Sequence, residues 1–231
     1  MLPHSIKLVL FDLVGTIVKD CSEGPSIIVQ SMTDAFAANG INVSAKYVKE
    51  QRGKEKRKAI EEILRGHVKP DTAHFKKLTA NVYERFLTAL RTRVNDFTPM
   101  EKVTDVFRFL KKRGIYVGVG SGLPVEILDM LVVHLGWKKA HLIDYVQSAE
   151  TIGTGRPDPK MIHDMMAEFG VVDPRNVVKV GDTMVDILEG KNAHVWTVAV
   201  LSGTQSEDEL KSVKPDFMVA KVHDLPQLFS E

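Results

Sequence analysis

Short apolar runs alternate with amphipathic stretches along most of the chain. The runs are as long as buried strands and rich in aliphatic residues, whereas the stretches between them repeat apolar residues at helical spacing. Strands are predicted over residues 7–11, 115–120, 144–148, 177–180, 195–200 and 217–219. Helices are predicted over 26–38, 100–113, 158–169 and 184–192, from 125 to about 134, and as a short last helix over 223–229. This alternation predicts an α/β fold, a Rossmann-like and mostly parallel sheet covered on both faces.

The pattern changes between the first and second predicted strands. Residues 39–93 contain no clear strand pattern; helices are predicted over 44–51, 54–65 and 71–93, separated by Gly53 and by a break over 66–70. We therefore expect a small helical cap domain, residues 21–95, inserted into a core domain made of residues 1–20 and 96–231.

Composition points to a globular cytoplasmic protein. Apolar residues make up 44% of the 231 residues and charged residues 26%, which is ordinary for a soluble protein. No apolar run approaches the roughly 20 residues of a membrane helix, and the first strand follows Met1 without a leader pattern. The single cysteine, Cys21, excludes an internal disulfide and cannot by itself form a thiolate metal site. A reducing, cytoplasmic setting is the expected location.

The net charge of +1 hides an uneven distribution. Residues 44–93 hold 14 Lys or Arg and 6 Asp or Glu, a balance of +8, so the rest of the chain carries −7. Solvated helix faces account for most of these charges, but a basic surface over a site would also attract small anions. A nucleic-acid partner is not expected, because the segment has few aromatic residues for stacking and no recognisable nucleic-acid module.

Polar side chains follow several predicted strands. Asp12, Ser121 and Asp182 come at strand ends, and Arg156 lies on a loop before a helix. The carboxyl ends of parallel strands share one edge of the sheet, where such folds bind ligands. Each residue alone has a structural alternative as a turn, cap or surface charge. Together they supply a carboxylate nucleophile, phosphate-binding donors and oxygen ligands for a hard divalent ion.

Four motifs resemble the haloacid dehalogenase superfamily, and more narrowly its phosphonoacetaldehyde hydrolase (phosphonatase) branch and uncharacterised relatives of that branch. The motifs are Asp-Leu-Val-Gly-Thr at 12–16, Gly-Ser-Gly at 120–122, Gly-Arg-Pro-Asp-Pro at 155–159, and the acidic stretch at 180–193. In the third motif arginine replaces the more usual lysine, as in phosphonatases. The resemblance covers nearly the whole chain, because the 20–26 loop and the helical insertion are similar to that branch's substrate-covering cap.

The resemblance implies a role for each motif residue. Asp12 would be the catalytic nucleophile and form an aspartyl-phosphate. Mg²⁺ would be bound by Asp12, by the backbone carbonyl of Val14 and by Asp182, with Asp186 acting through water or supporting the other ligands. The predicted phosphate-binding residues are Thr16, Ser121, Gly122 and Arg156.

Val14 departs from the pattern of ordinary phosphatases in this superfamily. Those enzymes have a second aspartate at this position, which protonates the leaving alkoxide and then activates water. Valine can do neither, and general acid-base catalysis contributes about 10²–10⁴-fold. The phosphonatase branch also has a small apolar residue there, because its electron sink is an imine between the substrate aldehyde and a cap lysine.

Lys56 occupies the position of that lysine, three residues after Gly53. Its neighbours Lys54, Arg57 and Lys58 are expected to lower the pKa of its amine by like-charge repulsion. The alternative is that this charged run is only a solvated helix face. Ala59 also stands where the phosphonatase branch has a histidine.

These patterns predict a Mg²⁺-dependent hydrolase of phosphonatase-like type that acts on a small phosphonate or phosphorylated metabolite. Two alternatives stay open: a specialised or weak phosphomonoester phosphatase, and a phosphate-binding protein without turnover. Dehalogenation is disfavoured, since that chemistry needs no metal and would leave the acidic fourth motif without a purpose. The expected partner is a small anion, with no membrane and no nucleic acid; the substrate and the oligomeric state, a homodimer included, are not specified.

Overall fold

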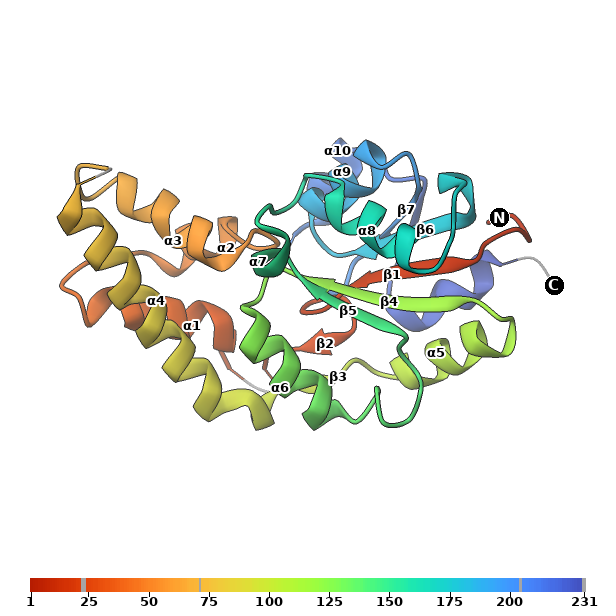
Figure 1. The fold of residues 1–231 in the computed structure, drawn as a ribbon, viewed down its shortest axis with the longest axis horizontal. Helices are drawn as coiled ribbons and strands as arrows, with labels where there is room; N and C mark the ends of the chain where they lie inside the picture. Colours follow the sequence, from red (N-terminus) through yellow and green to blue (C-terminus); the bar gives the residue numbers. More distant parts are fainter. Residues whose placement is uncertain (22–23, 71, 204, 230–231) are drawn as a thin grey trace.

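A parallel sheet of six strands forms the centre of the molecule (Figure 1). The computed structural model describes residues 1–231 except 22, 23, 71, 204, 230 and 231. The strand order is β5-β4-β1-β6-β7-β8, with the first strand in the interior. The strands are β1 (Leu8–Asp12), β4 (Tyr116–Ser121), β5 (Tyr145–Ser148), β6 (Val177–Gly181), β7 (Trp196–Val200) and β8 (Phe217–Val219). The predicted α/β fold is confirmed.

The alternating side chains of β1 enter two different cores. Phe11 points to one face of the sheet and contacts Phe107 edge to face, with ring centroids 5.5 Å apart. Leu10 points to the other face and packs in the cluster that contains Met165. Successive strand residues face opposite sides, so a strand buried on both faces has to be apolar throughout. This explains the unbroken apolar run before Asp12 and fixes the strand between two helical layers.

Helices cover both faces of the sheet. In Figure 1, α8 and α9 lie above it and α5 and α6 below it. The helical segments of the core are α5 (Val103–Lys112), α6 (Val125–Leu135), α7 (Ala149–Ile152), α8 (Lys160–Glu168), η2 (Pro174–Asn176), α9 (Met184–Asn192), α10 (Glu207–Ser212) and η3 (Val222–Leu228). Among the described residues, no helix combines the length and the apolar character that a membrane crossing requires.

A helical region is inserted between two short strands that follow β1. These strands, β2 (Val18–Lys19) and β3 (Thr98–Pro99), pair antiparallel, so the chain leaves and re-enters the core at one place. The inserted segments are α1 (Ile27–Ala37), α2 (Ala45–Glu50), α3 (Lys56–Arg65), α4 (Ala73–Arg93) and η1 (Val94–Asp96). Figure 1 shows this region at the end of the molecule away from the two termini, and β1 runs toward it.

Most predicted helices end within about two residues of the observed ones, the helix predicted from residue 100 begins at Val103, and two of the differences have local reasons. The helix predicted from residue 54 begins at Lys56, because the Glu55 carboxylate caps it by accepting from the backbone N–H groups of Arg57 and Lys58, at 2.7 and 2.8 Å. The last helix is a 3-10 helix, Val222–Leu228, which contains Pro226 and so lacks one backbone donor. The prediction also missed β2, β3, α7 and α10, all of six residues or fewer.

Candidate active site

Asp12 is the last residue of β1 and lies beside Gly120 of β4 in the parallel register. The chain then turns at Gly15, whose φ of +100° is a conformation that residues with a side chain rarely adopt. A Cβ atom on Gly15 would lie only 2.3 Å from Oδ2 of Asp182. The turn therefore brings the end of β1 against the end of β6 only because residue 15 has no side chain.

Three carboxylates gather at this edge of the sheet. Asp12, Asp182 and Asp186 are all buried, and each has a carboxylate oxygen within 4.8 Å of those of the other two. The Thr16 hydroxyl donates to Oδ1 of Asp182 at 2.8 Å, whereas Oδ2 has no hydrogen-bond partner among the described residues. Burial raises the pKa of Asp182 well above its usual value, and the charges of Asp12 and Asp186 raise it further. Among the described residues, Asp182 thus differs from Asp12 and Asp186 in having no cation paired with it.

The buried charges around this cluster do not balance. Glu189 joins the three aspartates, while Arg156 and Lys179 are the buried cations in ion pairs with this group. When all four carboxylates are ionised, the two cations that pair with them leave an excess of negative charge, which a divalent ion would offset. The unpartnered oxygen of Asp182 and the purely carboxylate donor set suit a hard cation such as Mg²⁺. The residues present therefore fit the predicted metal.

Arg156 holds the carboxylate of Asp12 in place. One guanidinium nitrogen, Nη1, donates to Oδ1 of Asp12 at 2.6 Å, and the other, Nη2, donates to the carbonyl oxygen of Gly120 at 2.6 Å. Its Nε lies 3.2 Å from Oε2 of Glu189. Burial disfavours the charged form of Arg156, but Asp186, Asp12 and Glu189 raise its pKa above the usual value. A planar cation with three fixed directions can orient Asp12 as a single point charge could not.

Lys179 and Glu189 were not singled out from the sequence. Lys179 lies in β6 and its Nζ is 3.1 Å from Oδ1 of Asp186 and 2.9 Å from Oε2 of Glu189. Burial alone would raise the pKa of Asp186, yet Arg156 and Lys179 hold it below the usual value. A signal was present: a lysine within the apolar strand Val177–Gly181 must be buried, and lysine is almost never fully buried without a partner.

Ser121 is the last residue of β4, and Gly122 follows it and lies against the cap. Ser121 is buried, and its Oγ accepts from the backbone N–H of Leu123 at 3.1 Å. A Cβ atom on Gly122 would lie 2.4 Å from the carbonyl oxygen of Lys54, which belongs to the cap. Thr16 is different from these two: its hydroxyl is directed to Asp182. The phosphate-binding roles of Thr16, Ser121, Gly122 and Arg156 stay predictions.

Cap residues 53–55 lie directly on the core. Gly53 has a φ of +78°, and a Cβ atom there would lie 2.3 Å from Cγ2 of Val185. Gly155 of the core also lies close to the cap, because a Cβ atom on Gly155 would be 3.2 Å from Cβ of Glu55. Together with Gly122, these glycines let two backbone segments approach without side chains between them. The close approach places the first residue of α3, Lys56, over the strand ends.

Lys56 is buried in a small cavity that it shares with Asp12, Val14, Ser121 and Arg156. The cavity has a volume of ≈ 30 Å³. Nζ of Lys56 donates to the carbonyl oxygen of Lys54 at 2.8 Å. Burial lowers the pKa of Lys56 to about 8; the charge of Asp12 opposes this effect, and those of Arg156 and Arg52 add to it.

The expected cause of this low pKa was wrong. Lys54 is bonded to Glu62 at 2.8 Å, the Arg57 guanidinium lies 4.2 Å from the ring centroid of Tyr83, and Nζ of Lys58 donates to the carbonyl oxygen of Gly153 at 3.0 Å. The charged groups of Lys54, Arg57 and Lys58 thus each contact a partner other than Lys56. Desolvation, which no sequence pattern reports directly, is the main cause.

The metal assignment leads to a first prediction. Asp182→Asn should lower Mg²⁺ affinity by at least about tenfold, because a charged oxygen ligand becomes a neutral one in a site that needs positive charge. Calorimetric titration of the protein with MgCl₂ measures the affinity without any substrate. Asp208→Asn, an exposed carboxylate on α10, is the matched control. Unchanged affinity in Asp182→Asn would place the metal elsewhere.

Comparison with known proteins identifies the family of the chain. The profile of haloacid dehalogenase-like hydrolases matches residues 6–194. The phosphonoacetaldehyde hydrolase of Latilactobacillus sakei is 32% identical, covering 96% of this chain and 82% of its own length. That of Bordetella pertussis is 25% identical, covering 100% and 93%.

Solved structures show the same fold. A phosphonoacetaldehyde hydrolase-like protein from Oleispira antarctica superimposes with a TM-score of 0.82 at 22% identity, over 97% of this chain and 91% of that one. A predicted phosphoglycolate phosphatase from Haemophilus somnus gives 0.80 at 19% identity, over 97% and 98%. The sequence matches add the family to the fold. This chain belongs to the haloacid dehalogenase-like hydrolases, and its relatives include phosphonoacetaldehyde hydrolases.

Proposed function

We propose that this hydrolase cleaves the carbon–phosphorus bond of a small phosphonate aldehyde, with phosphonoacetaldehyde as the reference substrate. The observation that carries the proposal is the buried amine of Lys56, with a pKa of about 8, in one cavity with the carboxylate of Asp12. Relatives named phosphonoacetaldehyde hydrolases support the same chemistry. Val14 supports it further, because this cavity offers no aspartate at the position where a phosphatase would protonate an alkoxide.

Lys56 would prepare the bond for cleavage. Its neutral amine attacks the aldehyde carbon and water is lost, which leaves a protonated imine. The iminium then accepts the electron pair of the carbon–phosphorus bond and becomes an enamine. Protonation of the enamine carbon and hydrolysis of the imine release acetaldehyde and return the free amine. A buried lysine is suited to this role, because desolvation keeps a usable fraction of its amine uncharged near neutral pH.

Asp12 would receive the phosphoryl group. Its carboxylate oxygen forms a bond to phosphorus as the bond to carbon breaks, and the resulting aspartyl-phosphate is hydrolysed to phosphate. Arg156 orients the attacking carboxylate through its 2.6 Å bond to Oδ1. Asp12, the Val14 carbonyl and Asp182 would hold Mg²⁺, with Asp186 acting through water or supporting these ligands, and the bound ion would supply positive charge near the phosphoryl oxygens. Ser121 and Gly122 would bind those oxygens from the end of β4.

Phosphate release from two substrate classes tests this proposal. Phosphonoacetaldehyde should release phosphate and acetaldehyde in equal amounts, and chelation of Mg²⁺ should stop the release. Phosphate monoesters of similar size, such as phosphoglycolate, should be poor substrates because no acid stands at position 14. Rapid ester hydrolysis with no release from the phosphonate would instead support the phosphatase alternative. Binding of phosphate with no phosphate release from either substrate class would instead support a phosphate-binding protein without turnover.

The pKa of Lys56 gives a second prediction. Imine formation needs the neutral amine, so kcat/KM for phosphonoacetaldehyde should rise with pH up to about 8 and level off above it. Below that pH the amine is protonated and the rate should fall about tenfold for each unit. Initial rates from pH 6 to 9.5, with Mg²⁺ held constant, measure the profile. A profile that is flat across this range would mean that no amine of this pKa takes part before the first irreversible step.

A further inference from the structure

Side chains of the cap donate hydrogen bonds to the core around α6 and α7. Among the described residues, these contacts join Tyr83 to Glu150, Lys58 to the carbonyl oxygen of Gly153, and Arg91 to Glu126. Figure 1 shows α7 at the end of the sheet that faces the cap. Because α3 of the cap carries Lys56, contacts on this side of the cap bear on where its amine lies.

Tyr83 makes the most buried of these contacts. Its hydroxyl donates to Oε1 of Glu150 at 2.5 Å, and the residue is only 3% exposed. The side chains of Arg91 and Glu126 are 37% and 47% exposed, and Lys58 is also exposed. Water screens exposed ion pairs, so they contribute little, whereas a shielded hydrogen bond to a carboxylate contributes more. We call the Tyr83–Glu150 hydrogen bond the latch.

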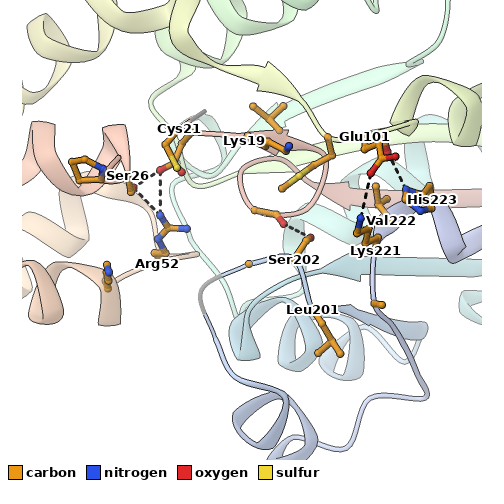
Figure 2. A pocket seen from close by; sticks show the side chains of 18 of the residues that line it. Lys19, Cys21, Ser26, Arg52, Glu101, Leu201, Ser202, Lys221, Val222 and His223 are labelled. Atoms are coloured by element: carbon orange, nitrogen blue, oxygen red, sulfur yellow. Dashed lines mark hydrogen bonds and ion pairs between the residues drawn. The ribbon is translucent and has the colours of Figure 1, made fainter. Parts of the chain in front are cut away.

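Arg52 makes another polar contact of the cap, but its partners do not belong to the sheet. Its Nη2 donates to Oγ of Ser26 at 2.7 Å and to Oδ2 of Asp20 at 3.2 Å. Figure 2 shows the guanidinium turned toward Ser26. Ser26 caps α1 of the cap itself, and Asp20 directly follows the connecting strand β2. This contact therefore joins the cap to its own point of attachment and does not fix it over the strand ends.

The latch is close to the helix that carries Lys56. The guanidinium of Arg57, the next residue in α3, lies 4.2 Å from the ring centroid of Tyr83. Helices α3 and α4 also share one buried apolar cluster, to which Ile60 and Val82 belong. A shift of Tyr83 away from the core would therefore move the start of α3, and with it the amine of Lys56.

Glu150 is held by the core segment that contains the predicted phosphate-binding residues. Its other carboxylate oxygen, Oε2, accepts from the backbone N–H of Val125 at 2.8 Å. The Ser148 hydroxyl donates to the carbonyl oxygen of Leu123 at 2.6 Å, and the N–H of Leu123 donates to Oγ of Ser121 at 3.1 Å. One short segment that ends at Glu150 thus contacts both the end of β4 and the cap tyrosine.

The Tyr83 hydroxyl stays a donor over the pH range in which the amine of Lys56 titrates. Burial, and then the hydrogen bond to Glu150 and its charge, raise the pKa of Tyr83 above its usual value, although the charge of Arg57 opposes this. The hydroxyl therefore keeps its proton near pH 8, the pKa of Lys56, and the latch can form there.

We propose that the latch positions Lys56: the hydrogen bond from Tyr83 to Glu150 sets the place of its amine relative to the end of β4. This role rests on the proposed function, in which the amine must reach the aldehyde carbon while the phosphoryl group lies at Asp12. Both ends of one small substrate are then met at a fixed separation. Neither latch residue is among the described residues that line the cavity of Lys56 and Asp12, so both act through Lys56.

Acetylation of lysine amines tests the latch without any substrate. A buried amine reacts with N-hydroxysuccinimidyl acetate only when the structure around it opens, so the labelling rate of Lys56 measures how often the cap exposes it. Tyr83→Phe keeps the ring but removes the donor, and should raise this rate about tenfold. Mass spectrometry of the digested chain gives the rate for each lysine. Lys179, buried in β6, is labelled only when the core opens and should not change.

Two further variants assign the effect to the latch. Tyr47→Phe, at an exposed cap tyrosine on α2, is the matched control and should leave the labelling rate of Lys56 within about twofold. Glu150→Gln keeps an acceptor without the negative charge, so it should raise the rate only about threefold. Thermal melts identify a variant that has not folded, and Glu150→Gln keeps the test decisive if Tyr83→Phe is one.

Kinetics test whether the displaced amine matters to the reaction. Tyr83→Phe should lower kcat for phosphonoacetaldehyde by at least about threefold, because a misplaced reacting group is costly. Phosphate affinity should stay within about twofold, since Asp12, Ser121 and Arg156 are unaltered. A structural defect of the whole site would lower both, and would contradict a role confined to Lys56.

The outcomes separate this inference from the proposed function. Unchanged labelling of Lys56 in Tyr83→Phe, or an equal rise at Lys179, overturns the latch. Faster labelling of Lys56 with an unchanged kcat overturns its positioning role. None of these results bears on whether the unchanged protein hydrolyses phosphonoacetaldehyde. Conversely, faster labelling of Lys56 alone supports the latch even if that aldehyde is not hydrolysed.

Discussion

Asp12→Asn should abolish turnover while the fold stays intact. The amide has nearly the same shape as the carboxylate but cannot attack phosphorus. In other enzymes, removing the nucleophile or a residue that activates it lowers kcat by on the order of 10⁴–10⁶-fold. Arg156 keeps an acceptor, because the amide oxygen can replace Oδ1 at the 2.6 Å contact. The pKa of Asp12 is raised by burial and by the charge of Asp186, so the substitution also removes a buried charge that is unfavourable there.

Two measurements check this prediction. Single-turnover phosphate release gives the chemical step, and thermal unfolding without Mg²⁺ should show a Tm equal to that of the unchanged protein or higher. Asp34→Asn, an exposed carboxylate on α1, is the matched control and should retain full activity. Phosphate release by Asp12→Asn at the unchanged rate would show that another group attacks phosphorus.

Lys56→Arg should lower kcat for phosphonoacetaldehyde hydrolysis by at least about 10³-fold, as expected when a residue that forms a covalent intermediate is lost. The guanidinium keeps positive charge but is too weak a nucleophile to form an imine. Phosphate affinity on the core side should change little, because Asp12, Ser121 and Arg156 are unaltered. Steady-state kinetics together with phosphate binding separate the two effects.

Lys58→Arg is the control for the charged run itself. Lys58 lies two residues further along α3, is exposed and contacts the carbonyl oxygen of Gly153. Its replacement should leave kcat within about twofold, since surface substitutions rarely have large effects. If Lys56→Arg were equally mild, the run would be a solvated face with no catalytic lysine.

The sheet could be predicted because its inner strands β1 and β6 are buried throughout. In β1 the residues on one side pack against α5 and those on the other against α8, so no polar position interrupts the run before Asp12. The same regularity placed Asp12 and Asp182 at one edge, and their proximity is confirmed. Short elements carry too few residues for a period to show, which is why β2 and β3 were missed. Ser206 and Glu209 form a capping box that could have indicated α10.

The contacts between cap and core could not be predicted from the sequence. Whether Lys56 is buried depends on the close approach at Gly53 and Gly122, which joins segments far apart in the chain. The predicted domain boundaries, at residues 20–21 and 95–96, the individual site roles, the cytoplasmic location and the oligomeric state stay predictions.

Borohydride trapping tests the imine on Lys56 most directly. Phosphonoacetaldehyde, Mg²⁺ and borohydride are incubated with the protein, the chain is digested, and the peptide containing Lys56 is analysed by mass spectrometry. We expect one stable adduct, an ethyl or phosphonoethyl group on the Lys56 nitrogen, together with loss of activity, and neither in Lys56→Arg. Continued release of phosphate from phosphonoacetaldehyde with no adduct on Lys56 would contradict the proposed mechanism.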